Sequence, residues 1–176
     1  MQALRQEKTL NIANLLTVFR IALLPAIVWR FRAGDMRGAL VVYLLAMLSD
    51  AADGYVARRF NQITALGKLL DPLADKLCLI TLLGLFVLDG QISRSLLGMV
   101  LLKETLLIVG SFAALKEGVV VCAHPIGKLT TAAFVLSMSL RFLAFRMAAD
   151  ILLWLSVLLS IVSLFWYGVI LIEKAN

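Results

Sequence analysis

Residues 151–172 read ILLWLSVLLSIVSLFWYGVILI, a run of 22 residues without a single charged side chain. A helix needs about 20 apolar residues to cross the hydrocarbon core of a bilayer. Trp154 near the start of the run, and Trp166 and Tyr167 near its end, are typical of the interfaces between membrane and water. The segment therefore predicts a transmembrane helix, and it decides the class of fold.

The composition extends this prediction to the whole chain. Of 176 residues, 62% are hydrophobic and only 16% are charged, and the mean hydropathy is +0.97. A soluble domain of this length could not bury so much apolar surface. We expect one all-α domain over residues 1–176, with a short interfacial segment at 1–10. Six transmembrane helices are expected at 12–31, 36–57, 66–88, 94–115, 128–148 and 151–172.

The charged residues indicate which partners to expect. Lys and Arg number 17 against 11 Asp and Glu, and the basic side chains lie mainly where apolar runs end. Anionic lipid head groups and phosphate-bearing substrates are therefore expected in place of nucleic acid. Arg141 and Arg146 are interpreted as interfacial side chains that reach toward head groups. Cys78 and Cys122 show neither metal-ligand spacing nor a disulfide framework.

Four of the seven aspartates lie in one stretch of the chain. Asp50 and Asp53 are spaced i, i+3, and Asp71 and Asp75 are spaced i, i+4, so each pair shares one face of a helix. The connection between the two helices is short, which favours antiparallel neighbours. Both pairs of carboxylates can then converge across one helix–helix interface.

Converging carboxylates need cations, and this set suits metal ions. Carboxylate oxygens are ligands that Mg²⁺ and Mn²⁺ prefer, and four of them suffice for two ions. Two such ions are a common arrangement for displacement at phosphorus. Gly54 and Ala57 leave room for a bulky ligand on the same face, and Arg58 offers a planar fork to a phosphate.

Structural explanations of the same aspartates remain open. Asp71 precedes Pro72 and could cap a helix whose first turn contains Asp75. The other pair could form ion pairs that hold the bundle together, with the candidate cations Arg58, Arg59, Lys68 and Lys76.

A known family signature is similar to the complete pattern Asp50-x2-Asp53-Gly54-x2-Ala57-Arg58-x8-Gly67-x3-Asp71-x3-Asp75. It is the signature of the CDP-alcohol phosphotransferases. The resemblance implies a homodimer of six-helix protomers in a bacterial-type cytoplasmic membrane, with the active site at the cytoplasmic edge. It also implies that an alcohol hydroxyl displaces CMP from a CDP-linked substrate, with Mg²⁺ or Mn²⁺ required.

The resemblance also implies residue roles. The metal ligands are Asp50, Asp53, Asp71 and Asp75, and Asp75 also accepts the proton of the attacking hydroxyl. The stretch Asn11-Ile-Ala-Asn14-Leu-Leu-Thr17-Val-Phe-Arg20 resembles the family's Asn-x-Pro-Asn-x-x-Thr-x-x-Arg segment, although its polar groups could instead serve only interhelical hydrogen bonds. The CDP-binding residues are then Asn14, Thr17, Gly54, Ala57, Arg58, Thr64 and Gly67.

The resemblance leaves several acceptor alcohols open. Residues 127–131, Gly-Lys-x-Thr-Thr, resemble family members that use glycerol 3-phosphate with CDP-diacylglycerol. Arg20, Lys103 and Lys128 could gather near the carboxylate face and bind an anionic acceptor, although Lys103 could simply pair with Glu104. Phosphatidylglycerol or an inositol phosphate as acceptor, and a CDP-polyol donor with a lipid alcohol, remain alternatives.

Two other classes of protein could contain four acids among apolar helices. A divalent-cation transporter could use them for permeation, but Arg58 would repel the ion and the acids lie near one membrane edge. A scaffold without chemistry would leave four desolvated acids unexplained.

Overall fold

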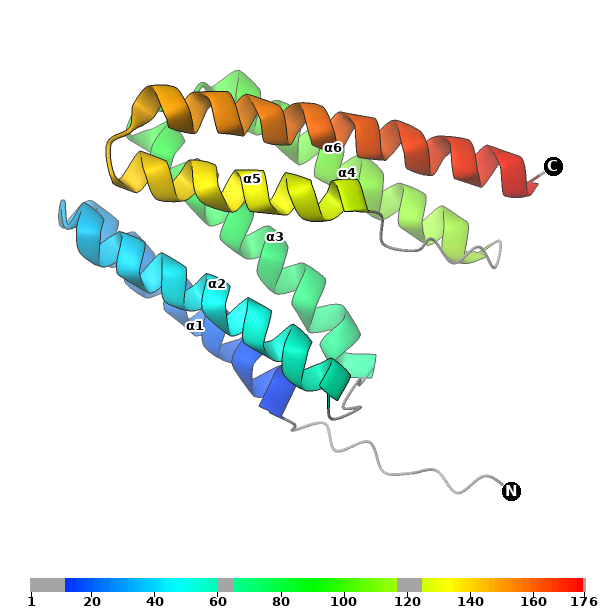
Figure 1. The fold of residues 1–176 in the computed structure, drawn as a ribbon, viewed down its shortest axis with the longest axis horizontal. Helices are drawn as coiled ribbons and strands as arrows, with labels where there is room; N and C mark the ends of the chain where they lie inside the picture. The colour runs from blue at the N-terminus through cyan, green and yellow to red at the C-terminus, as the bar shows by residue number, and fades with distance from the viewer. Residues whose placement is uncertain (1–11, 60–64, 117–124, 176) are drawn as a thin grey trace. The chain divides into compact units, whose positions relative to one another are not determined.

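The computed structural model describes the backbone of residues 12–59, 65–116 and 125–175, and the side chains of residues 14–53, 70–107 and 126–165. Within these ranges all regular structure is α-helical, as predicted, and no strand occurs. The predicted interfacial segment at 1–10 lies outside the described residues. The helices are α1 (Ile12–Arg32), α2 (Met36–Arg59), α3 (Ala65–Leu88), α4 (Arg94–Lys116), α5 (Pro125–Phe142) and α6 (Arg146–Ala175) (Figure 1).

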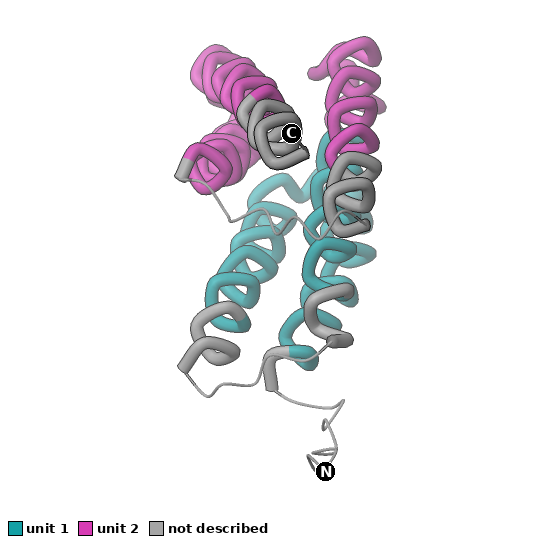
Figure 2. The backbone as a smooth tube through the Cα atoms, turned by 90° about the vertical axis from the view of Figure 1, so that its right-hand side faces the viewer, with its two compact units in different colours: residues 1–85 teal, residues 86–176 magenta. Residues whose placement is uncertain are grey.

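The chain forms two compact units, residues 1–85 and residues 86–176 (Figure 2). In the first unit α1 and α2 pack together as an antiparallel hairpin, and α3 completes the unit. In the second unit α5 and α6 form a similar hairpin, and α4 contacts α6. Each unit has its own buried apolar side chains, such as Ile27, Tyr43 and Leu82 in the first and Met138 and Leu153 in the second.

The two hairpins turn in the same way. Gly34 and Ala144 both have positive φ, at 77° and 64°. The Gly34 N–H donates to the carbonyl of Phe31, and the Ala144 N–H donates to that of Arg141. In both turns the next residue donates five positions back, which completes a Schellman motif that satisfies the last carbonyls of the first helix.

The predicted fifth helix, 128–148, is wrong at its end. α5 stops at Phe142 and α6 begins at Arg146, so the turn lies inside the predicted span. Ala144 adopts the left-handed conformation that glycine normally supplies at this position. An alanine carries no turn signal in the sequence, which is why the boundary was misplaced.

The α1 surface is the reverse of a soluble amphipathic helix. Thr17 and Arg20 are buried, whereas Leu15 and Phe19 are 61% and 48% exposed. α6 repeats the pattern, since Ser156 and Ser160 are buried and their apolar neighbours are exposed. Exposed apolar faces of this extent suit contact with lipid. Among the described residues, two helical segments are long and apolar enough to cross a membrane, Asn14–Arg32 and Arg146–Phe165.

Arg141 corrects one interpretation from the sequence. Its side chain is buried instead of reaching toward head groups. Nη1 donates to the carbonyl of Gln91 over 3.0 Å, and Nη2 pairs with the carboxylate of Asp150. The guanidinium also lies over the ring of Phe86, 5.7 Å from its centroid. Arg141 of α5 therefore links the segment before α4 to the beginning of α6 within the second unit.

Candidate active site

The aspartates of the signature lie on two helices of the first unit. Asp50 and Asp53 are one turn apart in α2, and Asp71 and Asp75 are one turn apart in α3. Their side chains differ in exposure: that of Asp53 is 7% exposed, that of Asp50 is 44% exposed and that of Asp75 is 63% exposed. Asp71 is half-buried, so the four acids extend from a buried position to an open one.

The structure excludes one structural explanation of Asp71. A capping residue stands at the first position of a helix, outside its hydrogen-bonded turns. α3 already begins at Ala65, so Asp71 and Pro72 lie inside the helix. The proline is tolerated within α3, and Asp71 is free of any capping task at the start of this helix.

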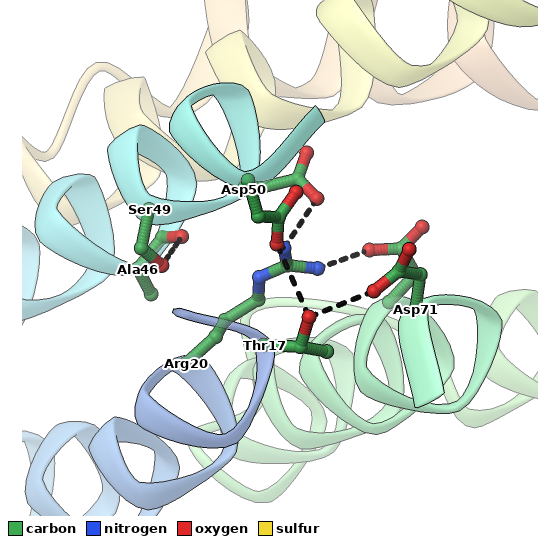
Figure 3. Close-up of polar contacts among 8 residues, drawn as sticks. Thr17, Arg20, Ala46, Ser49, Asp50 and Asp71 are labelled. Atoms are coloured by element: carbon green, nitrogen blue, oxygen red, sulfur yellow. Dashed lines mark hydrogen bonds and ion pairs between the residues drawn. The ribbon is translucent and has the colours of Figure 1, made fainter. Parts of the chain in front are cut away.

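Arg20 of α1 joins the two acidic helices. Its side chain is 1% exposed, and Nη2 lies 2.6 Å from Asp50 Oδ1 and also contacts Asp53 Oδ2. Nη1 donates to Asp75 Oδ1 over 2.8 Å. One guanidinium thus contacts three carboxylates from α2 and α3, and Figure 3 shows it lying between the acidic helices.

Thr17 brings the fourth aspartate into the same cluster. Its hydroxyl donates to Asp71 Oδ1 over 2.7 Å and lies 3.4 Å from Asp53 Oδ2 (Figure 3). Thr17 and Arg20 are one turn apart, so α1 presents both to the acids from a single face. Asn14, one further turn away, is also buried. The polar stripe of α1 is the buried wall of the acidic cluster.

The sequence allowed Arg20 to lie near the carboxylate face as a contact to the acceptor, but it missed the direct pairing between Arg20 and the acids. The candidate cations for the aspartates were neighbours along the chain, whereas Arg20 is 33 residues from Asp53 and 55 from Asp75. A signal was present, because Arg20 continues the i, i+3 stripe of Asn14 and Thr17. A buried polar stripe on an apolar helix indicates polar partners on its neighbours.

The chemical type of the donor atoms in this cluster suits divalent metal ions. Every donor that the four aspartates and Thr17 offer is a hard oxygen, which suits Mg²⁺ or Mn²⁺. Within the described side chains, no three acids, histidines or cysteines are grouped to hold a metal ion as they stand. The guanidinium of Arg20 takes the central position between the carboxylates.

The remaining predicted residues fall into two groups. Lys103 and Lys128 belong to the second unit, where Lys103 Nζ lies 2.5 Å from Glu104 Oε1 and Lys128 is exposed. Their approach to the aspartates therefore stays a prediction. The other group lies outside the residues whose side chains are described: Gly54, Ala57, Arg58, Thr64 and Gly67.

These observations define a helical protein with lipid-compatible outer faces and an oxygen-rich acidic cluster. The family model of the CDP-alcohol phosphatidyltransferases matches residues 10–162, and the chain belongs to this family. It is a phosphatidyltransferase of phospholipid biosynthesis and a membrane protein. Divalent metals are generally used in this family.

Two of the relatives match most of the chain, and a third matches about half of it. A protein of Bacillus subtilis (strain 168) is 32% identical over 177 residues, covering 87% of this chain and 91% of that protein. A protein of Rickettsia bellii (strain RML369-C) is 30% identical over 170 residues, covering 89% and 93%. Both are named CDP-diacylglycerol–glycerol-3-phosphate 3-phosphatidyltransferase. A Mycobacterium tuberculosis (strain CDC 1551 / Oshkosh) protein, provisionally named a cardiolipin synthase, is 39% identical over 88 residues, covering 49% and 42%.

Proposed function

We propose that this chain transfers the phosphatidyl group of CDP-diacylglycerol to glycerol 3-phosphate, producing phosphatidylglycerophosphate and CMP. The observation that carries the proposal is the convergence of the aspartates of α2 and α3 on the polar wall of α1. Glycerol 3-phosphate is favoured as acceptor because the relatives named for it match almost end to end. Phosphatidylglycerol is the second candidate, supported by the half-length match to the mycobacterial protein.

Asp50, Asp53, Asp71 and Asp75 are proposed to hold two divalent ions, Mg²⁺ or Mn²⁺. Among the described side chains, three of these carboxylates contact the guanidinium of Arg20 and the fourth, that of Asp71, accepts from Thr17, so the cluster has more acid than Arg20 can neutralise. Such ions would neutralise the negative charge on the oxygens of the diphosphate, which makes the phosphorus easier to attack. Thr17 fixes the orientation of Asp71 through its hydrogen bond.

Asp75 is proposed to be the general base. The acceptor hydroxyl oxygen forms a bond to the phosphorus that carries diacylglycerol, the bond from that phosphorus to the CMP oxygen breaks, and the hydroxyl proton passes to Asp75. Its side chain is 63% exposed, so an acceptor can reach it from outside the helices. A positioned base of this kind contributes about 10²–10⁴ in rate.

The proposed substrate contacts follow the family signature. Small residues let the nucleotide approach the backbone of α2 and α3, and Arg58 contributes positive charge toward the diphosphate. The proposed contacts to CDP are Asn14, Thr17, Gly54, Ala57, Arg58, Thr64 and Gly67. Positive charge for the acceptor phosphate is assigned to Arg20, Lys103 and Lys128.

All six helices are proposed to span the membrane as one domain over residues 1–176, in a homodimer with the active site on the cytoplasmic side. The exposed apolar faces of α1 and α6 support membrane insertion. The family match from residue 10 to residue 162 extends over both compact units, which supports a single domain. A donor with two acyl chains suits this arrangement, because the chains stay in lipid while the head group reaches the acids.

A divalent-cation transporter is disfavoured by the charge within the cluster. Arg20 contacts three of the four acids with a fixed positive charge. A permeating dication would have to pass this guanidinium against electrostatic repulsion.

The proposed reaction is tested with purified protein in detergent, Mg²⁺, CDP-diacylglycerol and a panel of acceptor alcohols. CMP release should require an acceptor, and thin-layer separation should show phosphatidylglycerophosphate as the main product with glycerol 3-phosphate. Cardiolipin formation from phosphatidylglycerol at a higher rate would replace the first acceptor by the second. Metal flux into liposomes without CMP release would contradict the proposed enzymatic function.

A further inference from the structure

Arg20 occupies the same oxygen atoms that a metal site in this cluster would require. Its Nη2 lies 2.6 Å from Asp50 Oδ1 and contacts Asp53 Oδ2, and its Nη1 donates to Asp75 Oδ1. These are three of the four proposed metal ligands. A carboxylate oxygen that accepts a short bond from a guanidinium has less electron density to offer to a second cation.

The burial of Arg20 makes this pairing more than a surface ion pair. The Arg20 side chain is 1% exposed, and a charge removed from water to this extent needs nearby opposite charge. The acids have the same need for a cation. Arg20 approaches from the buried side of α1, whereas Asp50 and Asp75 remain 44% and 63% exposed on the other side. A second cation can therefore approach the acids from the side opposite to the guanidinium.

We propose that Arg20 is a built-in counter-ion of the acidic cluster that competes with divalent cations for Asp50, Asp53 and Asp75. It holds the acids of α2 and α3 together by itself, and its charge weakens the binding of each metal ion that arrives. Metal binding draws the carboxylates away from the guanidinium and frees its Nη atoms. Arg20 is therefore a positioning residue, because it acts through the aspartates that it contacts. The inference rests on the proposed metal site. It adds that Arg20 sets the affinity of this site for divalent ions.

Arg141 supplies the matched control within the same chain. It is also buried, and it also pairs with an aspartate, Asp150, and with a backbone carbonyl. The difference is the number of carboxylates: three contact Arg20, and a single one, Asp150, contacts Arg141 in the described part of the chain. Replacing Arg141 disturbs a buried arginine without changing the acidic cluster.

The test measures Mn²⁺ binding to detergent-solubilised protein. Binding is monitored through the loss of the electron paramagnetic resonance signal of the free ion. Arg20→Gln should lower the dissociation constant by about tenfold, because a unit positive charge a few ångströms from the ion is removed. Arg20→Lys retains the charge and should bind Mn²⁺ like the wild type, and so should Arg141→Gln. An unchanged or weaker affinity in Arg20→Gln would overturn the proposal.

The metal site and the competition fail in different ways. A wild type that binds no Mn²⁺, with Asp71→Asn indistinguishable from it, would overturn the proposed metal site and this inference with it. A wild type that binds Mn²⁺ through Asp71, together with an Arg20→Gln variant of unchanged affinity, would overturn only the competition.

A measurement on the wild type tests the same proposal without depending on the folding of Arg20→Gln. Phenylglyoxal modifies accessible arginine side chains, and mass spectrometry follows each site. Arg20 should react several-fold faster with saturating Mg²⁺ than with a chelator, whereas the rate at Arg141 should stay the same. Equal rates at Arg20 in the two conditions, in protein that binds the ion, would contradict the release of its guanidinium.

Discussion

The α1–α2 hairpin and the α5–α6 hairpin share a turn but differ in what surrounds their buried arginine. Both turns are Schellman motifs around a left-handed residue. In the first unit Arg20 contacts three aspartates from two helices. In the second unit Arg141 contacts one aspartate, one carbonyl and one aromatic ring. A balanced charge such as Arg141 stabilises a fold, whereas an excess of acid around one cation prepares a site for further cations.

The largest expected effect comes from replacing one aspartate partner of each buried arginine. Asp75→Asn should lower kcat by about 10³-fold, because the proposed base no longer accepts the hydroxyl proton. Asp150→Asn should lower the thermal stability and leave the specific activity of the folded protein intact. CMP release and thermal unfolding in detergent measure the two effects. Comparable kcat losses in both variants would abolish the distinction between the regions.

A buried hydroxyl in each unit gives a second, smaller contrast. Thr17→Val removes the hydrogen bond to Asp71 and should reduce kcat/KM by about tenfold, the lower end of the range expected for a bond to a charged group. Ser137 is equally buried and donates to the carbonyl of Ala149. Ser137→Ala should cost about 1 kcal/mol of stability without changing kcat/KM. A normal kcat/KM in Thr17→Val would remove Thr17 from the active site.

Because both hairpins have the same turn, introducing a glycine into one and an alanine into the other should change the stability in opposite directions. Ala144→Gly should stabilise the protein by about 1 kcal/mol, because an L-residue at positive φ is strained. Gly34→Ala introduces the same strain into the first hairpin and should destabilise it by about 1 kcal/mol. Thermal unfolding of both variants checks the signs, and a shift in the same direction for both would show that the two turns are not equivalent.

The smallest expected effect concerns the cap of α2. The Gly38 N–H donates to the Asp35 carboxylate and Arg30 pairs with it, and together they lower the pKa of Asp35 below its ordinary value. A lowered pKa in the folded state adds stability above the ordinary pKa, and this stability is lost as the pH falls through the folded-state value. The melting temperatures of wild type and Asp35→Asn should therefore differ at neutral pH and converge below about pH 4. A constant difference down to pH 3 would exclude the charge as its cause.

Much of the helical architecture follows from the apolar runs of the sequence. Four of the six predicted segments begin and end within two residues of the observed helices, whereas the fifth runs past the end of α5 and the sixth starts after α6 has begun. Runs of this length leave little choice, because helices satisfy every backbone hydrogen bond within the segment. The failure lies at Ala144, where the left-handed conformation is imposed by the turn and not by the preference of the residue.

The acidic cluster was predictable in part. The i, i+3 and i, i+4 spacings assign Asp50, Asp53, Asp71 and Asp75 to common helix faces without any structure. Their partner was not predictable from local spacing, because the candidate cations nearby in sequence outnumber the distant one. The burial of Arg141 was missed for a related reason, since Gln91 and Phe86 are distant along the chain, although its third partner, Asp150, lies close by in sequence.

The amino-acid sequence alone determines that this protein is helical, rich in lipid-compatible surface, and equipped with aspartates on two helix faces. These properties are set by the length of apolar runs and by the period of the helix, which are local. Tertiary structure decides which cation answers the acids and which arginine is buried, because such pairing depends on how separate helices pack. The i, i+3 stripe places Arg20 on the polar face of α1, but only the packing of the helices decides that this arginine meets three of the aspartates.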